Sequence, residues 1–141
     1  MPTNVLLVED SPGDVRLTQE AFRDANQDID LHVANDGVEA MAFLLREGAH
    51  ADAPRPDLIL LDLNLPIMDG REVLAEIKQS PSLKRIPVIV LTTSSADEDI
   101  IRSYDLHANS YISKPVNYPQ FLAVIEQIES FWISIVTLPA P

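Results

Sequence analysis

Short runs of apolar residues alternate along the chain with longer segments in which apolar residues recur every three or four positions. Continuous runs such as Leu58–Leu61 and Val88–Leu91 are typical of parallel strands that are buried on both faces. The runs together predict five strands: Asn4–Val8, Ile29–Ala34, Asp57–Asp62, Pro87–Leu91 and Ser110–Ile112.

The segments between these runs have the period of amphipathic helices. The clearest is the last, in which Phe121, Ile125 and Ile128 follow one another at helical spacing. Five helices are predicted: Gly13–Ala25, Gly37–Glu47, Gly70–Gln79, Ala96–Leu106 and Tyr118–Trp132. Strands that alternate with helices imply βαβ units, and right-handed crossovers place helices on both faces of a doubly wound parallel α/β sheet.

A length of 141 residues fits one domain, with a loop at Gly48–Pro56 and no internal repeat. We assign residues 1–132 to this domain and 133–141 to an apolar C-terminal tail. The tail either folds back onto its own sheet or forms an apolar patch that pairs with a second copy. We favour the homodimer, because so short a tail has little of its own to pack against.

The composition of the chain limits the kinds of partner that the protein can bind. The net charge of −12 argues against a nucleic-acid binder, which needs clustered Lys and Arg. The chain has no cysteine, no signal-peptide pattern at its start and no apolar stretch long enough to cross a membrane. We therefore expect a cytoplasmic protein without membrane contact.

Three acidic residues follow two of the predicted buried strands. Glu9 and Asp10 come directly after the first strand, and Asp62 ends the third. Taken singly, each could be a solvated turn residue. Because sites in open α/β sheets lie beyond the carboxyl ends of the strands, topology brings the three together, where they repel unless a cation lies between them. An all-oxygen cluster favours a hard ion, so Glu9, Asp10 and Asp62 predict a Mg²⁺ site.

The same edge of the sheet offers the parts of a phosphoryl-transfer site. Asp62 is the candidate nucleophile, and Asn64 can give its backbone carbonyl to the metal. Thr92 follows the fourth apolar run and can donate its hydroxyl, while Lys114 can reach a phosphoryl oxygen as a point charge. Pro115 is a candidate for a cis peptide in a tight turn.

Four sequence blocks now give a resemblance that covers about residues 4 to 130. In chain order they read Leu7-Val8-Glu9-Asp10, Leu60-Leu61-Asp62-Leu63-Asn64-Leu65-Pro66-Ile67-Met68-Asp69-Gly70, Val90-Leu91-Thr92-Thr93 and Tyr111-Ile112-Ser113-Lys114-Pro115. The chain resembles the response-regulator receiver domains of two-component signalling. The resemblance implies a flavodoxin-like fold with strand order 2-1-3-4-5.

It also implies the roles of the site residues. Asp62 would take a phosphoryl group from the phosphohistidine of a sensor histidine kinase, and Glu9, Asp10 and the Asn64 carbonyl would bind Mg²⁺ beside it. Thr92 and Lys114 would contact the phosphoryl group. Tyr111 is similar to the aromatic switch of the family, which turns inward as the threonine moves. The surface that responds would be roughly Ala96–Trp132.

A narrower resemblance concerns the loop after the second helix, the run Ser103-Tyr104-Asp105-Leu106-His107 and the tail that begins Phe131-Trp132. These are similar to the response regulators of cyanobacterial phytochromes. The similarity implies a light-sensing phytochrome kinase as partner and a homodimer built on the switch surface. No further domain follows that surface in this sequence, so we expect a stand-alone receiver.

Two rivals remain. A phosphatase or phosphotransferase that forms an aspartyl phosphate usually needs a second Asp two residues after the nucleophile, but Asn64 stands there and cannot protonate a leaving group. The other rival is a receiver-like module that binds its partner without phosphorylation; the intact set of Asp10, Asp62, Thr92 and Lys114 speaks against it. We therefore expect a phosphoacceptor and not an enzyme for external substrates.

Overall fold

A computed structural model describes residues 2–24, 28–93, 97–115, 117–135 and 138–139. The strands are β1 (Thr3–Val8), β2 (Ile29–Ala34), β3 (Leu58–Leu61), β4 (Val88–Thr92) and β5 (Ser110–Ser113). The α-helices are α1 (Pro12–Asp24), α2 (Gly37–Leu45), α3 (Gly70–Gln79), α4 (Asp97–Asp105) and α5 (Tyr118–Ile128). Two shorter helical segments are η1 (Gly48–His50) and η2 (Glu129–Ile135). The predicted helix ends at Ala25 and Ala96, and tail residues 136–137 and 140–141, lie outside the described residues.

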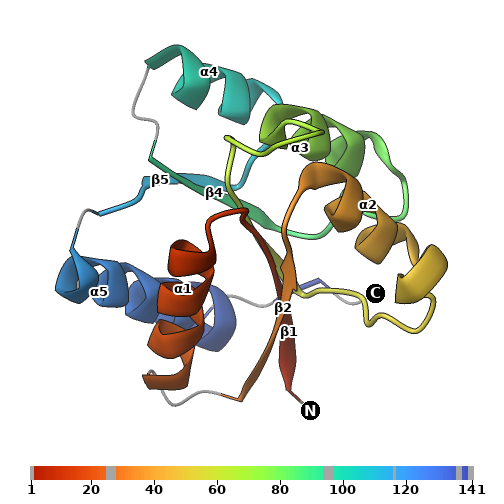
Figure 1. The fold of residues 1–141 in the computed structure, drawn as a ribbon. Helices are drawn as coiled ribbons and strands as arrows, with labels where there is room; N and C mark the ends of the chain where they lie inside the picture. Colours follow the sequence, from red (N-terminus) through yellow and green to blue (C-terminus); the bar gives the residue numbers. More distant parts are fainter. Residues whose placement is uncertain (1, 25–27, 94–96, 116, 136–137, 140–141) are drawn as a thin grey trace.

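The five strands form one parallel sheet in the order β2-β1-β3-β4-β5, which confirms the predicted doubly wound, flavodoxin-like arrangement. Helices α1 and α5 cover one face of the sheet, and α2 and α3 cover the other, with α4 next to the β5 edge (Figure 1). The strand order reverses between β1 and β3, so the carboxyl ends of these two strands open a crevice.

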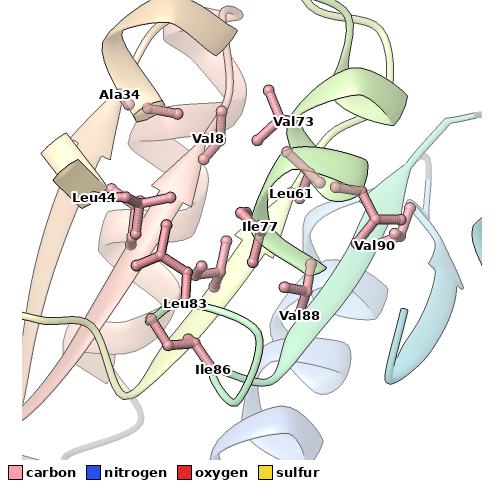
Figure 2. Close-up of a cluster of buried hydrophobic side chains, with 14 of the residues drawn as sticks. Val8, Ala34, Leu44, Leu61, Val73, Ile77, Leu83, Ile86, Val88 and Val90 are labelled. Atoms are coloured by element: carbon pink, nitrogen blue, oxygen red, sulfur yellow. The ribbon is translucent and has the colours of Figure 1, made fainter. Parts of the chain in front are cut away.

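Side chains along the three central strands alternate between two hydrophobic clusters. In β1, Leu6 and Val8 point to the cluster under α2 and α3, whereas Val5 and Leu7 point to the cluster under α1 and α5. Strands β3 and β4 repeat the pattern, which explains why their sequences are apolar without interruption. Figure 2 shows the first cluster, with Val8, Leu61 and Val90 from neighbouring strands packed together. Each fully buried Leu or Ile contributes about 1.5–3 kcal/mol.

Helix α2 ends two residues earlier than the apolar pattern predicts. Arg46 takes a left-handed conformation with φ of 56°, and its backbone N–H donates to Phe43 O at 3.2 Å. The N–H of Glu47 donates to Ala42 O at 2.9 Å. These two bonds satisfy the last carbonyls of the helix in the manner of a Schellman ending and turn the chain away.

The Lys114–Pro115 peptide is trans, as are the other described peptides, so the expectation of a cis bond is wrong. Trans is the favoured isomer before proline, as it is before other residues.

The predicted helix 118–132 divides into two parts. It is α-helical to Ile128, and the chain then widens into the π-helical segment η2. The wider turn packs Trp132 and Ile133 against the cluster under α1 and α5, while Phe131 stays 52% exposed. An α-helical period does not predict this change, because it treats the apolar residues as one continuing stripe. The division into domain and tail at residue 132 stays a prediction.

Glu129 at the start of η2 gives the fold a pH dependence. The residue is buried, its Oε2 has no hydrogen-bond partner among the described residues, and burial together with the charge of Glu126 raises its pKa from 4.5 to about 7. The unfolded carboxyl ionises near pH 4.5, so its contribution to stability is full below that pH and is lost as the pH rises towards 7 and above. We expect Glu129→Gln to raise the free energy of unfolding by about 1 kcal/mol at pH 8, with a smaller gain at pH 5.

Urea unfolding at the two pH values tests this. Glu76→Gln, which changes an exposed carboxylate on α3, is the matched control. An equal effect of Glu129→Gln at pH 5 and pH 8 would show that the carboxyl does not titrate in this range.

Within the described part of the chain, no helix combines the length and the apolar character needed to cross a lipid bilayer.

Candidate phosphorylation and metal site

The site residues meet because parallel strands end at one edge of the sheet. Val8 of β1 lies opposite Leu61 of β3, so the residues that follow them, Glu9 and Asp62, leave the sheet side by side. The backbone N–H of Asp62 donates to Val8 O at 3.0 Å and continues this ladder by one bond. Thr92 is the last residue of β4, and Lys114 directly follows β5.

Three carboxylates converge in the crevice. Glu9, Asp10 and Asp62 each offer one oxygen, and these oxygens all lie within 4.8 Å of one another. Glu9 and Asp62 are buried, whereas Asp10 is exposed to solvent. Such a group of carboxylate oxygens fits a hard divalent cation that keeps some of its waters. Asn64 is exposed in the loop after Asp62, and its backbone N–H donates to Asp62 Oδ1 at 3.1 Å.

Lys114 is the cation at the centre of this cluster. Its side chain is only 6% exposed, and its ammonium donates to Glu9 Oε2, to Asp14 Oδ2 at 3.0 Å and to Asp62 Oδ2 at 3.1 Å. All three ammonium donors are therefore used. Burial disfavours the charge, but the bonds to Glu9 and the two aspartates outweigh burial and raise the pKa of Lys114 above its ordinary value. Lys114 is charged at every physiological pH.

Asp14 is the member of the cluster that sequence reasoning missed. It lies in the first turn of α1, where acidic residues are common because the helix dipole favours them. Nothing in that pattern distinguishes a capping acid from an acid aimed at the site. Its place in the sequence is the signal that could have identified Asp14. It follows Glu9 and Asp10 by about one turn of a helix, which is close enough for its side chain to reach the same site.

Thr92 fixes the orientation of the Asp62 carboxylate. The fully buried Thr92 hydroxyl donates to Asp62 Oδ1 at 2.9 Å, and the same oxygen accepts the Asn64 N–H. The other oxygen, Oδ2, accepts from Lys114. The backbone ties the same residues together, because the Lys114 N–H donates to Thr92 O at 2.7 Å. Both carboxylate oxygens are thus held by donors that can also bind a phosphoryl group.

The two buried carboxyls titrate in opposite directions. Burial raises the pKa of Glu9 to about 7, although the bond and the charge of Lys114 act against it. Burial also opposes ionisation of Asp62. The charge of Lys114 and the hydrogen bonds from Asn64 and Thr92 outweigh this effect of burial and lower the pKa of Asp62. Asp62 is therefore ionised at neutral pH, while Glu9 is partly protonated until a second cation arrives.

Metal affinity should follow the titration of Glu9. Because the carboxyl must lose its proton to become a ligand, we expect the affinity for Mn²⁺ to rise by up to about tenfold per pH unit below pH 7 and to level off above it. Free Mn²⁺ counted by electron paramagnetic resonance at pH 6, 7 and 8 measures this. Glu9→Gln should bind more weakly and with little pH dependence. An unchanged wild-type affinity between pH 6 and pH 7 would contradict the role of Glu9.

A second ion-pair group links the loop after Asp62 to α4. The Arg71 guanidinium donates to Asp99 Oδ1 from Nη2 at 2.6 Å and from Nε at 3.1 Å, and to Asp69 Oδ1 from Nη1 at 3.0 Å. Asp69 also caps α3 by accepting the Arg71 backbone N–H at 3.0 Å. Sequence reasoning missed the bridge, because Asp99 lies 28 residues from Arg71.

Tyr111 lies on β5, opposite Val90 in the register. It is half-buried and packs against the cluster under α2 and α3. This position is beside the strand that carries Thr92, which is where a side chain that senses the threonine has to be. The role of Tyr111 as a switch stays a prediction.

Known proteins share both the sequence and the fold. The chain matches the response regulator receiver domain over residues 5–126. Response regulator Rcp1 of Synechocystis sp. strain PCC 6803 is 55% identical over 139 residues, which cover 99% of this chain and 95% of Rcp1. The crystal structure of the Mn²⁺-bound form of Rcp1 has a TM-score of 0.94 at 55% identity, covering 99% of this chain and 100% of the other.

The crystal structure of the phosphorylated cyanobacterial phytochrome response regulator RcpA has a TM-score of 0.96 at 54% identity, with coverage of 99% of this chain and 100% of the other. A divalent cation in one relative and a phosphoryl group in another match the chemistry of the oxygen donors and the buried cation described above. The family match spans most of the chain, and the fold agrees with it strand for strand. The chain belongs to the response regulator receiver domain family of two-component signalling.

Proposed function

We propose that the chain accepts a phosphoryl group on Asp62 and works as a signalling switch. The observation that carries this proposal is the buried Asp62 carboxylate, whose lowered pKa keeps it ionised and whose two oxygens are held by Thr92, Asn64 and Lys114. An ionised carboxylate at the mouth of a strand crevice is a competent nucleophile. Its donors are placed to stabilise charge on the oxygens of an incoming phosphoryl group.

The transfer conserves atoms and electrons. An oxygen of Asp62 attacks phosphorus in line, the bond from phosphorus to the donor nitrogen of a phosphohistidine breaks, and the imidazole leaves with the electron pair and takes up a proton. Glu9, Asp10, Asp62 and the Asn64 carbonyl would hold Mg²⁺, and its charge would screen the repulsion between the carboxylate and the phosphoryl group. Lys114 and Thr92 then donate to phosphoryl oxygens instead of to the free carboxylate.

The same geometry supports a way in which phosphorylation would change the surface that a partner binds. When the Thr92 hydroxyl follows the phosphoryl group, the end of β4 is drawn towards Asp62, and the packing beside Tyr111 on β5 changes. Added charge therefore shifts the population of two arrangements of α4, β5 and α5. Attack of water on the aspartyl phosphate resets the switch. Both self-phosphorylation from small donors and this spontaneous loss belong to the proposal.

A phytochrome-type sensor histidine kinase is the partner that the relatives support best. Support comes from the phytochrome response regulator RcpA, whose phosphorylated structure covers 99% of this chain. A phosphohistidine is a suitable phosphoryl donor for this site, and a histidine kinase supplies one. A cytoplasmic location stays a prediction from the sequence and forms part of the same proposal.

Phosphotransfer from a purified kinase tests the function. A ³²P-labelled phytochrome histidine kinase should lose its label to the wild-type chain within seconds to minutes in Mg²⁺, and a histidine kinase without a phytochrome module should transfer far more slowly. Equal rates from both would contradict the phytochrome partner but keep the phosphoacceptor. If the kinase binds wild type and Asp62→Asn equally and labels neither, the chain is a partner-binding module that does not need phosphorylation.

Homodimer formation is the second part of the proposal. Ile101 and Tyr104 on α4 and Phe131 in η2 are large apolar side chains that are at least half exposed. We expect the wild type to sediment as a dimer at about 50 µM, because burying such side chains against a second copy stabilises association. Phe131→Ser should shift the equilibrium at least about tenfold towards monomer.

The matched control for this measurement is Val38→Ser on α2. Val38 and Phe131 are equally exposed, at 52%, but Val38 lies on a helix of the opposite face of the sheet (Figure 1). Sedimentation velocity on the three proteins separates the two surfaces. A monomeric wild type, or an equal loss of dimer in both variants, would contradict a dimer contact at Phe131.

A further inference from the structure

A cavity of about 530 Å³ opens at the end of the sheet opposite Asp62. Arg46 at the end of α2, Arg55 before β3 and the loop Pro81–Arg85 before β4 form its wall. Parallel strands begin at this end and finish at the phosphorylation site. The cavity is therefore separate from the carboxylate cluster.

The wall is basic in a chain that is strongly acidic. Arg46, Arg55 and Arg85 all line the cavity, and none of the described residues that line it is acidic. The chain has 22 Asp and Glu residues but only 10 Lys and Arg residues. Three of these ten basic residues line this one cavity. Among the described residues, none of these three arginines has a carboxylate within ion-pair distance. Arg71, by contrast, pairs with two aspartates.

Backbone contacts place two of the arginines. The Arg55 Nη1 donates to Ser82 O at 2.6 Å, which holds the guanidinium against the loop before β4 and leaves its other N–H groups for a ligand. Arg46 occupies a left-handed position, with φ of 56°, that glycine would fill at lower cost by about 1 kcal/mol. An arginine in such a backbone conformation points to a use for its side chain.

Apart from Ser82, the rest of the wall is apolar. Leu44 and Leu83, which Figure 2 shows side by side in the core cluster, border the cavity together with Leu45 and Pro81. The volume lies in the range of sites for small organic ligands. Guanidinium forks match carboxylate and phosphate oxygens in pairs, while the leucines suit the carbon part of the same ligand.

We propose that this cavity binds an organic anion that carries two or more carboxylate or phosphate groups beside an apolar part. Two sources offer this chemistry: a free phosphate-bearing small molecule, or the acidic side chains of a segment of a partner protein. A long polyanion such as nucleic acid is disfavoured, since the net charge of −12 repels it over most of the surface. The proposal is independent of phosphorylation at Asp62.

Amide chemical shifts of the ¹⁵N-labelled full chain test it, with divalent metal removed so that phosphates do not reach the carboxylate cluster. The probes are inorganic pyrophosphate, a capped Glu-Leu-Glu peptide and, as a neutral control, a capped Gln-Leu-Gln peptide. Either charged probe should move the amides of Arg46, Arg55, Ser82 and Arg85 and leave Thr92 in place. Tighter binding of pyrophosphate indicates a free phosphate compound, and tighter binding of the acidic peptide indicates a protein segment.

Two variants make the test specific. The first is the double variant Arg46→Met with Arg85→Met. Neither arginine side chain makes a described hydrogen bond, and methionine removes the charge but keeps an unbranched stem. We expect the double variant to bind the charged probes at least about tenfold more weakly than wild type. Arg16→Met changes an arginine on α1 that is 81% exposed, and it should bind as wild type does. The proposal is overturned if neither charged probe moves these amides up to about 10 mM. It is also overturned if the neutral peptide binds equally, or if the double variant binds like wild type.

Discussion

Asp62→Asn is expected to abolish phosphoryl uptake while leaving the protein folded. The amide retains an oxygen that accepts the bonds now made from Thr92 and Asn64, so the crevice keeps its shape. It removes the ionised nucleophile, and no other described side chain holds the same place between Thr92 and Lys114. We expect the rate of labelling from acetyl phosphate in Mg²⁺ to fall by at least about a hundredfold.

Asp57→Asn is the matched control for this loss. Asp57 directly precedes β3, as Asp62 directly follows it, and its Oδ2 accepts the Asn4 backbone N–H at 2.9 Å. Asparagine can keep that bond through its carbonyl oxygen. Labelling of Asp57→Asn should therefore match the wild type, whereas an equal loss in both variants would mean that disturbance of β3, and not removal of the nucleophile, stops the reaction.

Gly70→Ala is expected to cost stability out of proportion to its size. A Cβ at Gly70 would lie 2.2 Å from the Asp62 carbonyl oxygen and 2.6 Å from Leu63 Cα. These are backbone atoms, and the Gly70 N–H donates to Leu63 O at 3.0 Å, so the loop that follows Asp62 would have to move as a unit. We expect the free energy of unfolding to fall by about 3 kcal/mol, with weaker metal binding as the loop shifts.

Gly13→Ala supplies the contrast. Gly13 lies in α1, and the nearest atom to a Cβ placed there is Ser11 Oγ at 3.9 Å. Alanine is the better helix former, so this variant should be as stable as the wild type or more stable by up to about 1 kcal/mol. Urea unfolding of both variants measures the difference. A Gly70→Ala protein as stable as the wild type would show that the loop after Asp62 is free to move.

The strands and the carboxylate crevice were predictable because they depend on local patterns and on a topological rule. Uninterrupted apolar runs mark strands covered on both faces, and once β1 and β3 are parallel neighbours, Glu9 and Asp62 have to meet. The convergence of Thr92 and Lys114 followed from the same rule, as each ends or follows a strand. None of these inferences needed a side-chain conformation.

Contacts that depend on side-chain direction were out of reach. The bond that Lys114 donates to Asp14 joins residues 100 positions apart, and the Arg71–Asp99 pair joins two helix starts. Both acids look like ordinary first-turn residues of their helices in the sequence. The change from α to π geometry after Ile128 was missed for a related reason, since it is decided by how Trp132 and Ile133 meet the core.

The most direct test of the account is to locate the phosphoryl group. The wild-type chain would be incubated with acetyl phosphate and Mg²⁺, weighed as the intact protein, reduced with borohydride to convert an aspartyl phosphate into homoserine, and mapped by peptide mass spectrometry. The account predicts the mass gain of one phosphoryl group, lost when the metal is chelated, and a single homoserine at position 62. A modified residue elsewhere, or a gain that persists in Asp62→Asn, would contradict it.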